Sequence, residues 1–423
     1  MTIIRQCVIV MAVMKQLYLK TLLVCLSFSL AGCGVHAVET TPDTSFMTAT
    51  DLHYLSPSLM ENLDLVKEAA EEGDGKTIIY GSQLTDAMIE TVIHNHPDAF
   101  ILTGDLTLNG EKTSHEELAE KLDEINDAGI PVLVIPGNHD LNNKHAIAYT
   151  NDGVQSVDSV TNDEFVQIYH NDGYDDALSR DSDSLSYVYR LDSGVRCLMI
   201  DVNGSSILGA VSDTTLTWIE QQLKKAKKAG EPVLAFSHQN FLVHMDLFTD
   251  GFRIANGDKL LDLFQAYGVK AGFSGHMHCQ HIASRNGFTE AVTSAISILE
   301  SHIASISIKN GTLSYQTESV DVDAWAKKHL VTDENLLHYS QYARDFFMKA
   351  IYAKSTGSAE LDDYIANLNA AFFTGSVDTI QDEPELDDQI AHMDDTMMAV
   401  YLQSVLKETG QDMNAFSISL NEN

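Results

Sequence analysis

Five apolar segments of this chain are each followed at once by side chains that can bind a metal ion. In chain order these side chains are Asp51 and His53, Asp105, Asn138 with His139 and Asp140, His238, and His276 with His278. Imidazole, carboxylate and amide oxygen, with no thiolate among them, form a ligand set that suits Mn, Fe, Zn or Ni. The set is too large for one tetrahedral ion, but it would serve two ions about 3.5–4 Å apart that share a bridging carboxylate. Such a pair of ions holds a phosphate oxygen and lowers the pKa of a bridging water, which gives hydroxide near neutral pH.

A single strand end of this kind also has a simpler interpretation. A carboxylate or amide can cap the next helix, and a histidine can be satisfied by backbone groups. This interpretation is preferred for Asp201, which follows "CLMI", and for His244. We prefer His238 to His244 and His302 as a ligand because it directly ends a strand. Five such ends in succession are hard to reconcile with capping alone.

Six apolar segments, the five above and a further one at 196–201, are predicted to be β-strands of an α/β fold. They cover residues 45–51, 98–105, 132–138, 196–201, 233–238 and 269–276, with helical segments at 113–129 and 212–230 between them. Ser114 and Glu117 form a Ser-x-x-Glu capping pattern in the first helix, and Gly129 and Gly230 end the two helices. Short apolar strands separated by helices favour a sheet that is covered on both faces. The carboxyl ends of parallel strands meet at one edge, where ligands bind, so the metal-binding side chains should gather there.

The chain changes character after a predicted hairpin at 304–316, whose turn is Asn310-Gly311. From about residue 321 the segments are helical. In the last of them, six apolar side chains are predicted to share one face: Leu386, Ile390, Met393, Met397, Val400 and Val405. This pattern predicts that the C-terminal helices dock onto the main domain.

The N-terminus is typical of a secretory signal peptide. Three basic residues precede an apolar stretch at 22–30, and the small residues of "LAGC" (30–33) follow it. "LAGC" resembles a bacterial lipobox, which would make Cys33 the lipidated first residue of the mature protein. We therefore predict a lipoprotein signal peptide (1–33), a tether (34–45), a catalytic domain (46–320) and a helical C-terminal region (321–423).

Charge and cysteine content limit the partners of the chain. The formal net charge of −35 argues against binding to a nucleic-acid polymer, which would be repelled. Cys197 and Cys279 remain in the main domain, and two buried free thiols are preferred to a disulfide between them.

The motif series resembles the calcineurin-like metallophosphoesterase family. The motifs Asp-x-His, Gly-Asp, Gly-Asn-His-Asp, His and Gly-His-x-His are present in the family's order as "DLH", "GDLTLNG", "GNHD", "SH" and "GHMH". The resemblance covers residues 46 to about 300. It implies an α/β fold of the two-sheet sandwich type, flanked by helices and followed here by an α-helical C-terminal extension.

The resemblance also implies a role for each motif residue. The first of two divalent ions (Mn, Fe, Zn or Ni) would be held by Asp51, His53, Asp105 and His278, and the second by Asp105 as the bridge with Asn138, His238 and His276. His139 would bind the phosphate or protonate the leaving oxygen, with Asp140 orienting its ring. Gly104, Gly137 and Gly275 would let the backbone pass close to the ions.

Departures from subfamily patterns narrow the predicted reaction. Purple acid phosphatases carry a tyrosine three residues after the bridging aspartate, where this chain has Leu108. Protein Ser/Thr phosphatases have an Asp-Arg-Gly run and Gly-Asn-His-Glu, and neither occurs here. The series is similar to bacterial phosphodiesterases of the class III cyclic nucleotide type and their lipoprotein relatives.

The resemblance thus implies a phosphodiesterase that acts through metal-bound hydroxide on a cyclic nucleotide or another small phosphodiester. A phosphomonoesterase acting on nucleotides or sugar phosphates is the alternative. A non-catalytic surface binding lipoprotein is the alternative of another class, but it should have lost ligands, and every position is filled. The expected partners are a small phosphate ester and, through the lipid anchor only, the extracytoplasmic face of the bacterial cell membrane.

Overall fold

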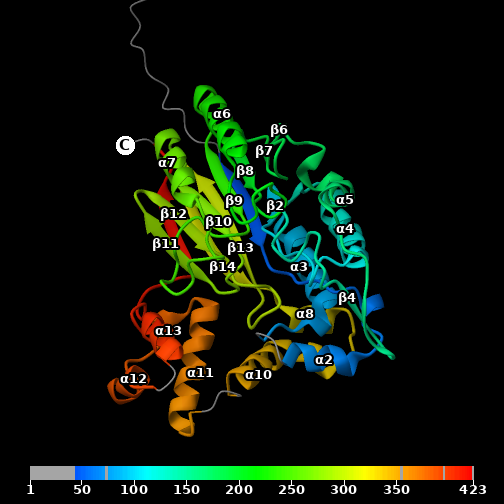
Figure 1. Cartoon of the computed structure of the whole chain (residues 1–423), viewed down its shortest axis with the longest axis vertical. Helices are drawn as coiled ribbons and strands as arrows, with labels where there is room; N and C mark the ends of the chain where they lie inside the picture. The colour runs from blue at the N-terminus through cyan, green and yellow to red at the C-terminus, as the bar shows by residue number, and fades with distance from the viewer. Residues whose placement is uncertain (1–42, 72–74, 353–355, 394–395, 422–423) are drawn as a thin grey trace, which may run out of the picture. The chain divides into compact units, whose positions relative to one another are not determined.

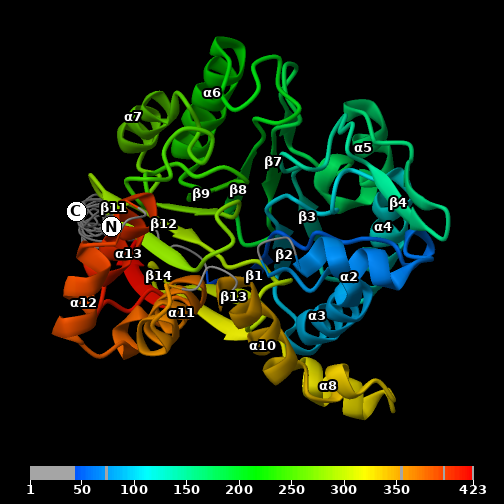
Figure 2. The same cartoon turned by 60° about the horizontal axis from the view of Figure 1, so that its bottom comes forward.

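The computed structural model describes residues 43–71, 75–352, 356–393 and 396–421, which belong to one compact unit (Figures 1 and 2). The predicted signal peptide, Cys33 and most of the tether lie outside the described residues and stay predictions. The last two residues of the predicted tether already belong to strand β1 (Thr44–Ala49). Among the described residues, no helix has the length and apolar character needed to span a bilayer.

Two large mixed sheets form the framework of the fold. The first has the order β15-β14-β13-β1-β2-β3, with β2 at Ala99–Leu102, β3 at Val132–Val134, β13 at His302–Lys309, β14 at Thr312–Ser319 and β15 at Ala415–Ser419. The second has the order β11-β12-β10-β9-β8-β7-β6, with β6 at Ser179–Arg180, β7 at Tyr187–Arg190, β8 at Arg196–Ile200, β9 at Val233–Ser237, β10 at Ala271–Ser274, β11 at His281–Arg285 and β12 at Phe288–Val292. A small hairpin pairs β4 (Ile147–Thr150) with β5 (Gly153–Ser156). Strands β1, β2 and β3 are parallel, and so are β8, β9, β10 and β12. The predicted α/β fold with two sheets is confirmed.

Helices cover the outer faces of the sheets, as Figure 1 shows for α6 and α7 on the second sheet. The helices in the first part of the chain are α2 (Leu63–Glu71), α3 (Gly81–Asn95), α4 (Lys112–Asp127), α5 (Asn162–Ile168), α6 (Asp213–Ala229) and α7 (Gly257–Tyr267). The C-terminal helices are α8 (Val322–Lys328), α9 (Glu334–Leu337), α10 (Tyr339–Tyr352), α11 (Ala359–Thr374), α12 (Pro384–Ala391) and α13 (Thr396–Leu406). Short 3-10 segments lie at Pro57–Leu59, Ile78–Tyr80 and Val377–Thr379, and a π turn lies at His170–Tyr174.

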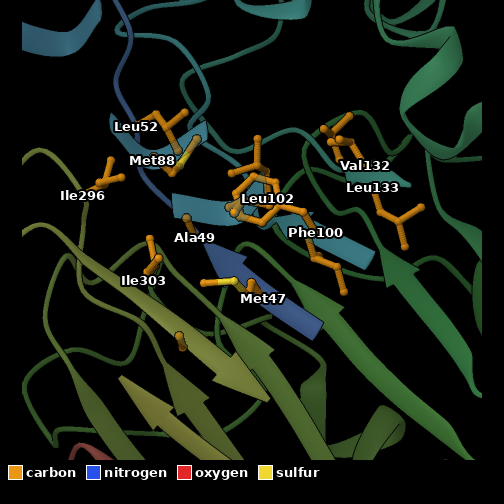
Figure 3. Close-up of a cluster of buried hydrophobic side chains, with 14 of the residues drawn as sticks. Met47, Ala49, Leu52, Met88, Phe100, Leu102, Val132, Leu133, Ile296 and Ile303 are labelled. Atoms are coloured by element: carbon orange, nitrogen blue, oxygen red, sulfur yellow. The ribbon is translucent and has the colours of Figure 1, made fainter. Parts of the chain in front are cut away.

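The alternation of side chains along the strands builds two layers of core. In β8, Cys197 and Met199 face the core between the sheets, whereas Leu198 and Ile200 face α6 and α7. Successive side chains of a strand point to opposite faces, so a strand that is covered on both faces must be apolar throughout. Figure 3 shows part of the core around β1 and β2, including Met47 and Phe100. This burial holds the strand ends in fixed positions.

The predicted capping pattern of the first helix differs from the structure. Helix α4 begins at Lys112, so Ser114 is not its N-cap. The Ser114 hydroxyl instead accepts a hydrogen bond from the backbone N–H of Ser56, and Glu117 accepts one from the hydroxyl of Tyr54. Tertiary contacts with the loop after β1 thus take both side chains that the capping pattern would have used.

The C-terminal region is helical as predicted, but it ends differently. The predicted apolar face is broken between α12 and α13, and Met397 and Val400 are 74% and 46% exposed. After α13 the chain returns to the first sheet, where β15 pairs antiparallel with β14. The ring of Phe416 stacks on Tyr315 with 5.4 Å between centroids. The end of the C-terminal region therefore shares a sheet with β1, β2 and β3.

A buried carboxyl group in the π turn should make stability depend on pH. Burial raises the pKa of Asp172 to about 7, although the amide of Asn126 donates a hydrogen bond to it. The unfolded chain ionises this group near its ordinary pKa, so stability falls as the pH rises from there to about 7 and stays low above it. We expect Asp172→Asn to raise the free energy of unfolding by on the order of 2 kcal/mol at pH 8 and much less at pH 5.

Urea denaturation at pH 5 and pH 8 measures this difference. The exposed Asp152→Asn serves as the control and should leave the pH dependence unchanged. An Asp172→Asn protein with the same pH dependence as the wild type would show that Asp172 is not the group responsible.

Candidate metal centre

The predicted ligands follow strands whose carboxyl ends meet between the two sheets. Backbone hydrogen bonds tie the loops together: the N–H of Asp51 donates to the carbonyl of Gly104 over 3.0 Å, and that of Gly275 donates to His238 over 3.1 Å. The two sheets are joined directly, because the N–H of His276 donates to Asp51 Oδ2 over 2.9 Å. These hydrogen bonds bring motifs that are far apart in the sequence together in one site.

A first group consists of Asp51, His53, Asp105 and His278, whose ligand atoms all lie within 4.8 Å of one another. His53 Nε2 lies 3.0 Å from His278 Nε2, and His278 Nε2 lies 3.3 Å from Asp51 Oδ1. All but His278 are fully buried or nearly so. The structure thus brings together the four side chains predicted for the first ion.

A second group consists of Asp105, His238 and His276, again with ligand atoms within 4.8 Å of one another. His238 Nε2 lies 3.3 Å from Asp105 Oδ2 and 3.1 Å from His276 Nδ1. Asn138 Oδ1 lies 3.0 Å from the same His238 nitrogen. Asp105 belongs to both groups, which is the position that a bridging carboxylate needs.

Unpaired atoms in this cluster fit two divalent cations. Asp51 Oδ1 is buried and has no hydrogen-bond partner in the part of the chain that the structure describes. A buried carboxylate oxygen without a partner is costly, and imidazole nitrogens that face each other repel unless a proton or cation lies between them. The carboxylate and imidazole donors suit Mn, Fe, Zn or Ni. The residues therefore fit the predicted pair of ions.

The charge states of the cluster agree with this fit. Burial works to raise the pKa of Asp105, but His238 overcomes it and holds that pKa well below its ordinary value. Burial, with the charge of His238, lowers the pKa of His276 to about 4 and leaves its ring unprotonated. His238 is the exception: Asp105 and Asp51 raise its pKa to about 9 in spite of burial. The carboxylate charges of Asp105 and Asp51 that favour the protonated form of His238 are the charges that would hold a cation.

The backbone is strained at most of the predicted ligands. Positive φ angles occur at Asp51 (52°), His53 (45°), Asp105 (47°), His276 (71°) and His278 (57°). This left-handed region is unfavourable for residues other than glycine, and such outliers cluster at functional sites. The strain indicates that the loops are shaped to aim these side chains inward.

His139 lies at the edge of the cluster, where its ring is 5.1 Å from that of His53. Its Nε2 is 4.0 Å from Asp105 Oδ2, and its side chain is 33% exposed. Its Nδ1 lies 2.8 Å from the carbonyl oxygen of Leu108, which assigns the Nδ1 proton to that hydrogen bond. Nε2 is then the nitrogen that can reach a substrate.

The prediction that Asp140 orients the ring of His139 is wrong. Asp140 points into the protein, where it accepts hydrogen bonds from the backbone N–H groups of Leu106, Thr107 and Gly137. The turn sends successive side chains in different directions, so neighbours in sequence are not neighbours in space. Asp140 instead fastens the loop of Asp105 to the loop of Asn138. The carbonyl of Leu108, which does orient His139, has no side-chain signature in the sequence.

The alternative histidines lie elsewhere, as predicted. His244 Nδ1 contacts His281 Nδ1 at 2.9 Å and its Nε2 lies 3.1 Å from Glu290. His302 lies 3.2 Å from Glu300. Neither belongs to the metal-binding groups found among the described residues.

Two mixed sheets thus bring together two ligand groups that share one carboxylate, an arrangement that suits two divalent ions. The model of the family described as calcineurin-like phosphoesterase matches residues 45–280, more than half of the chain. The chain belongs to this family. A second model, described as the C-terminal domain of cyclic nucleotide phosphodiesterase, matches residues 321–412.

The curated relatives and solved structures that resemble the chain have low sequence identity to it. The chain is 27% identical to serine/threonine-protein phosphatase CPPED1 of Danio rerio over 227 residues, which cover 51% of this chain and 65% of the relative. It is 25% identical to the protein of that name from Rattus norvegicus, with 51% and 64% covered. The chain thus spans slightly less than two thirds of the length of these relatives. Its fold is similar to a dimetal phosphatase from Danio rerio (TM-score 0.47, 13% identity, 66% of this chain and 97% of that chain).

Proposed function

We propose that this metallophosphoesterase hydrolyses small phosphodiesters such as cyclic nucleotides. The observation that carries the proposal is the pairing of two ligand groups on Asp105 with a C-terminal region similar to that of cyclic nucleotide phosphodiesterases. A series of aromatic contacts links that region to the site. The ring of Tyr401 in α13 lies 6.1 Å from that of Phe248, which packs on Phe252. The ring of Phe252 in turn lies 5.3 Å from that of His276. A diester also brings less negative charge than a monoester to a chain with a net charge of −35.

The side chains of the site have separate tasks. Two bound divalent ions would supply Lewis-acid stabilisation and a nucleophile at neutral pH. Asp51 and Asp105 are held as carboxylates, and the loops fix the imidazoles around them. His139, which is partly exposed and has Nε2 4.0 Å from Asp105 Oδ2, would donate a proton to the leaving oxygen or a hydrogen bond to the phosphate.

Phosphomonoester hydrolysis is the second candidate. It is favoured by the name of the curated relatives, which describes them as serine/threonine-protein phosphatases. A direct comparison separates the two candidates. The purified protein is stripped of metal, reloaded with Mn, Zn, Ni or Fe, and assayed on bis(p-nitrophenyl) phosphate and p-nitrophenyl phosphate. Preference for the diester supports the proposal, preference for the monoester supports the second candidate, and no turnover of either with both ions bound contradicts both.

Replacing His139 should slow the reaction without removing the ions. We expect His139→Asn to lower kcat by on the order of 10²–10⁴-fold for a diester with an alkyl leaving group. The loss should be smaller for a p-nitrophenyl ester, because that leaving group needs less protonation. Metal content is measured alongside the rates, and the exposed His145→Asn is the control. An equal loss on both esters would assign His139 to phosphate binding instead of proton donation.

A further inference from the structure

Strand β8 ends at the same edge as β9, its parallel neighbour, yet no metal ligand is predicted at its end. The residue that follows β8 is Asp201, which is almost completely buried. Its carboxylate accepts hydrogen bonds from the backbone N–H groups of Leu185, Asn203 and Gly204, over 2.7–3.1 Å. Asp201 does not cap the next helix as predicted, because Ser212 is the N-cap of α6; its carboxylate instead fixes the main chain at Asn203.

The side chain of Asn203 joins two loops of the metal centre. Its amide donates to the carbonyl of Pro136 over 3.0 Å and to Gln239 Oε1 over 3.0 Å. The bond is returned, because the amide of Gln239 donates to Asn203 Oδ1 over 2.7 Å. Gln239 is only 3% exposed, so these two reciprocal hydrogen bonds between the amides are partly buried.

The two loops that Asn203 joins carry ligands of the same ion. Pro136 lies two residues before Asn138, and Gln239 directly follows His238. Asn138 Oδ1 and His238 Nε2 are 3.0 Å apart in the second group. Asn138 is exposed, so the position of its amide depends on the backbone of its loop. The ligands of the first group, apart from the shared Asp105, come from other loops.

We propose that Asn203 is a positioning residue for the second ion, acting by holding the loops of Asn138 and His238 in register. Residues that do not bind the ion but hold its ligands in place by hydrogen bonds typically contribute 10–100-fold in metal affinity. The first ion does not depend on this contact, so loss of Asn203 should weaken the two ions unequally. The proposal concerns the metal centre and holds whether the substrate is a diester or a monoester.

Titration of the full-length, metal-stripped protein with Mn²⁺ tests the proposal, with metal analysis and Mn electron paramagnetic resonance as readouts. In Asn203→Ala we expect the affinity of the second ion to fall 10–100-fold while that of the first is unchanged. The spin-coupled signal of a Mn pair should give way to that of a single Mn ion at sub-saturating metal. Ser206→Ala, on the same loop and bonded instead to Asp183, should behave as the wild type.

A second variant guards against a general loss of folding. Asn203→Ala leaves the buried amide of Gln239 without a partner, whereas replacing both partners by apolar groups of similar shape is nearly neutral for stability. We therefore include the double variant Asn203→Leu with Gln239→Met, which should unfold at a urea concentration close to the wild type and still lose the second ion. Equal weakening of both ions, or two unchanged affinities, in this folded double variant would overturn the proposal.

Discussion

Replacing Asp105 by asparagine is expected to remove both metal ions and to lower kcat by on the order of 10⁴-fold or more. Asp105 Oδ2 lies 3.3 Å from His238 Nε2 and 3.9 Å from His53 Nε2, so it belongs to both ligand groups. Asparagine keeps the shape and can still accept the hydrogen bond that Oδ1 receives from the N–H of His139 over 2.9 Å. Asparagine lacks the negative charge of the carboxylate and its second metal-binding oxygen. Neither ligand group then keeps the carboxylate that the two groups share. Metal analysis of the purified protein and turnover of a diester measure the result.

Asp98→Asn is a matched control at the opposite end of the same strand. Its carboxylate accepts hydrogen bonds from the N–H of Ser45 and the hydroxyl of Thr44, far from the ligands. This variant should keep two ions and full activity. An Asp105→Asn protein that still held two ions, or lost one alone, would contradict a bridging role for Asp105.

The metal cluster was predictable because parallel strands impose a rule on the sequence. An apolar run must end at the sheet edge, so the first polar residues after each run are brought to that edge by burial alone. His238, the weakest motif in isolation, was placed by this rule, and it sits between Asp105 and His276. The observed strands are shorter than predicted; β3, for example, ends at Val134, well before Asn138. The intervening residues form the loops that aim the ligands.

The supporting contacts were not predictable in the same way, because they depend on which loops meet. Asp140 was assigned to its neighbour His139 and instead accepts from the backbone N–H groups of Leu106 and Thr107 in another loop and of Gly137 in its own turn. Asn203 carries no motif, and its importance arises from contacts with Pro136 and Gln239 that are distant in sequence. A local sequence pattern predicts where a strand ends and which residues follow it. These hydrogen bonds depend instead on how the two sheets pack, which no local pattern contains.

The end of the C-terminal region carries the sequence pattern of a strand, although the region was predicted to be helical throughout. Residues 415–419 alternate, with Phe416 and Ile418 packed against the core and Ser417 between them exposed. This is the period of a strand. The long helical segments before it favoured a wholly helical region, and the pairing partner β14 lies about one hundred residues earlier.

Replacing Gly137 by alanine is expected to damage the metal centre through a single methyl group. A Cβ at this position would lie 2.1 Å from Asp105 Oδ1 and 2.2 Å from the backbone nitrogen of Asp105, distances that real Cβ atoms do not adopt. Gly137 does not have a positive φ, so the effect comes from the contact alone. Overpacking of this kind typically costs about 1–3 kcal/mol. The displaced group would be the shared ligand itself.

We therefore expect Gly137→Ala to lose both ions at metal concentrations that saturate the wild type and to lower turnover by at least on the order of 10²-fold, the effect of a displacement near 1 Å. Gly81→Ala is the matched control, because its Cβ would meet nothing closer than 3.8 Å at the start of α3, where alanine favours the helix. That variant should be as stable as the wild type or slightly more so, with both ions bound. If Gly137→Ala bound both ions with wild-type affinity, the loop of Asp105 would have to move freely, which its hydrogen bonds to Asp140 do not allow. The comparison of the two alanines thus tests whether the close approach of two turns, and not only the ligands they carry, defines the metal centre.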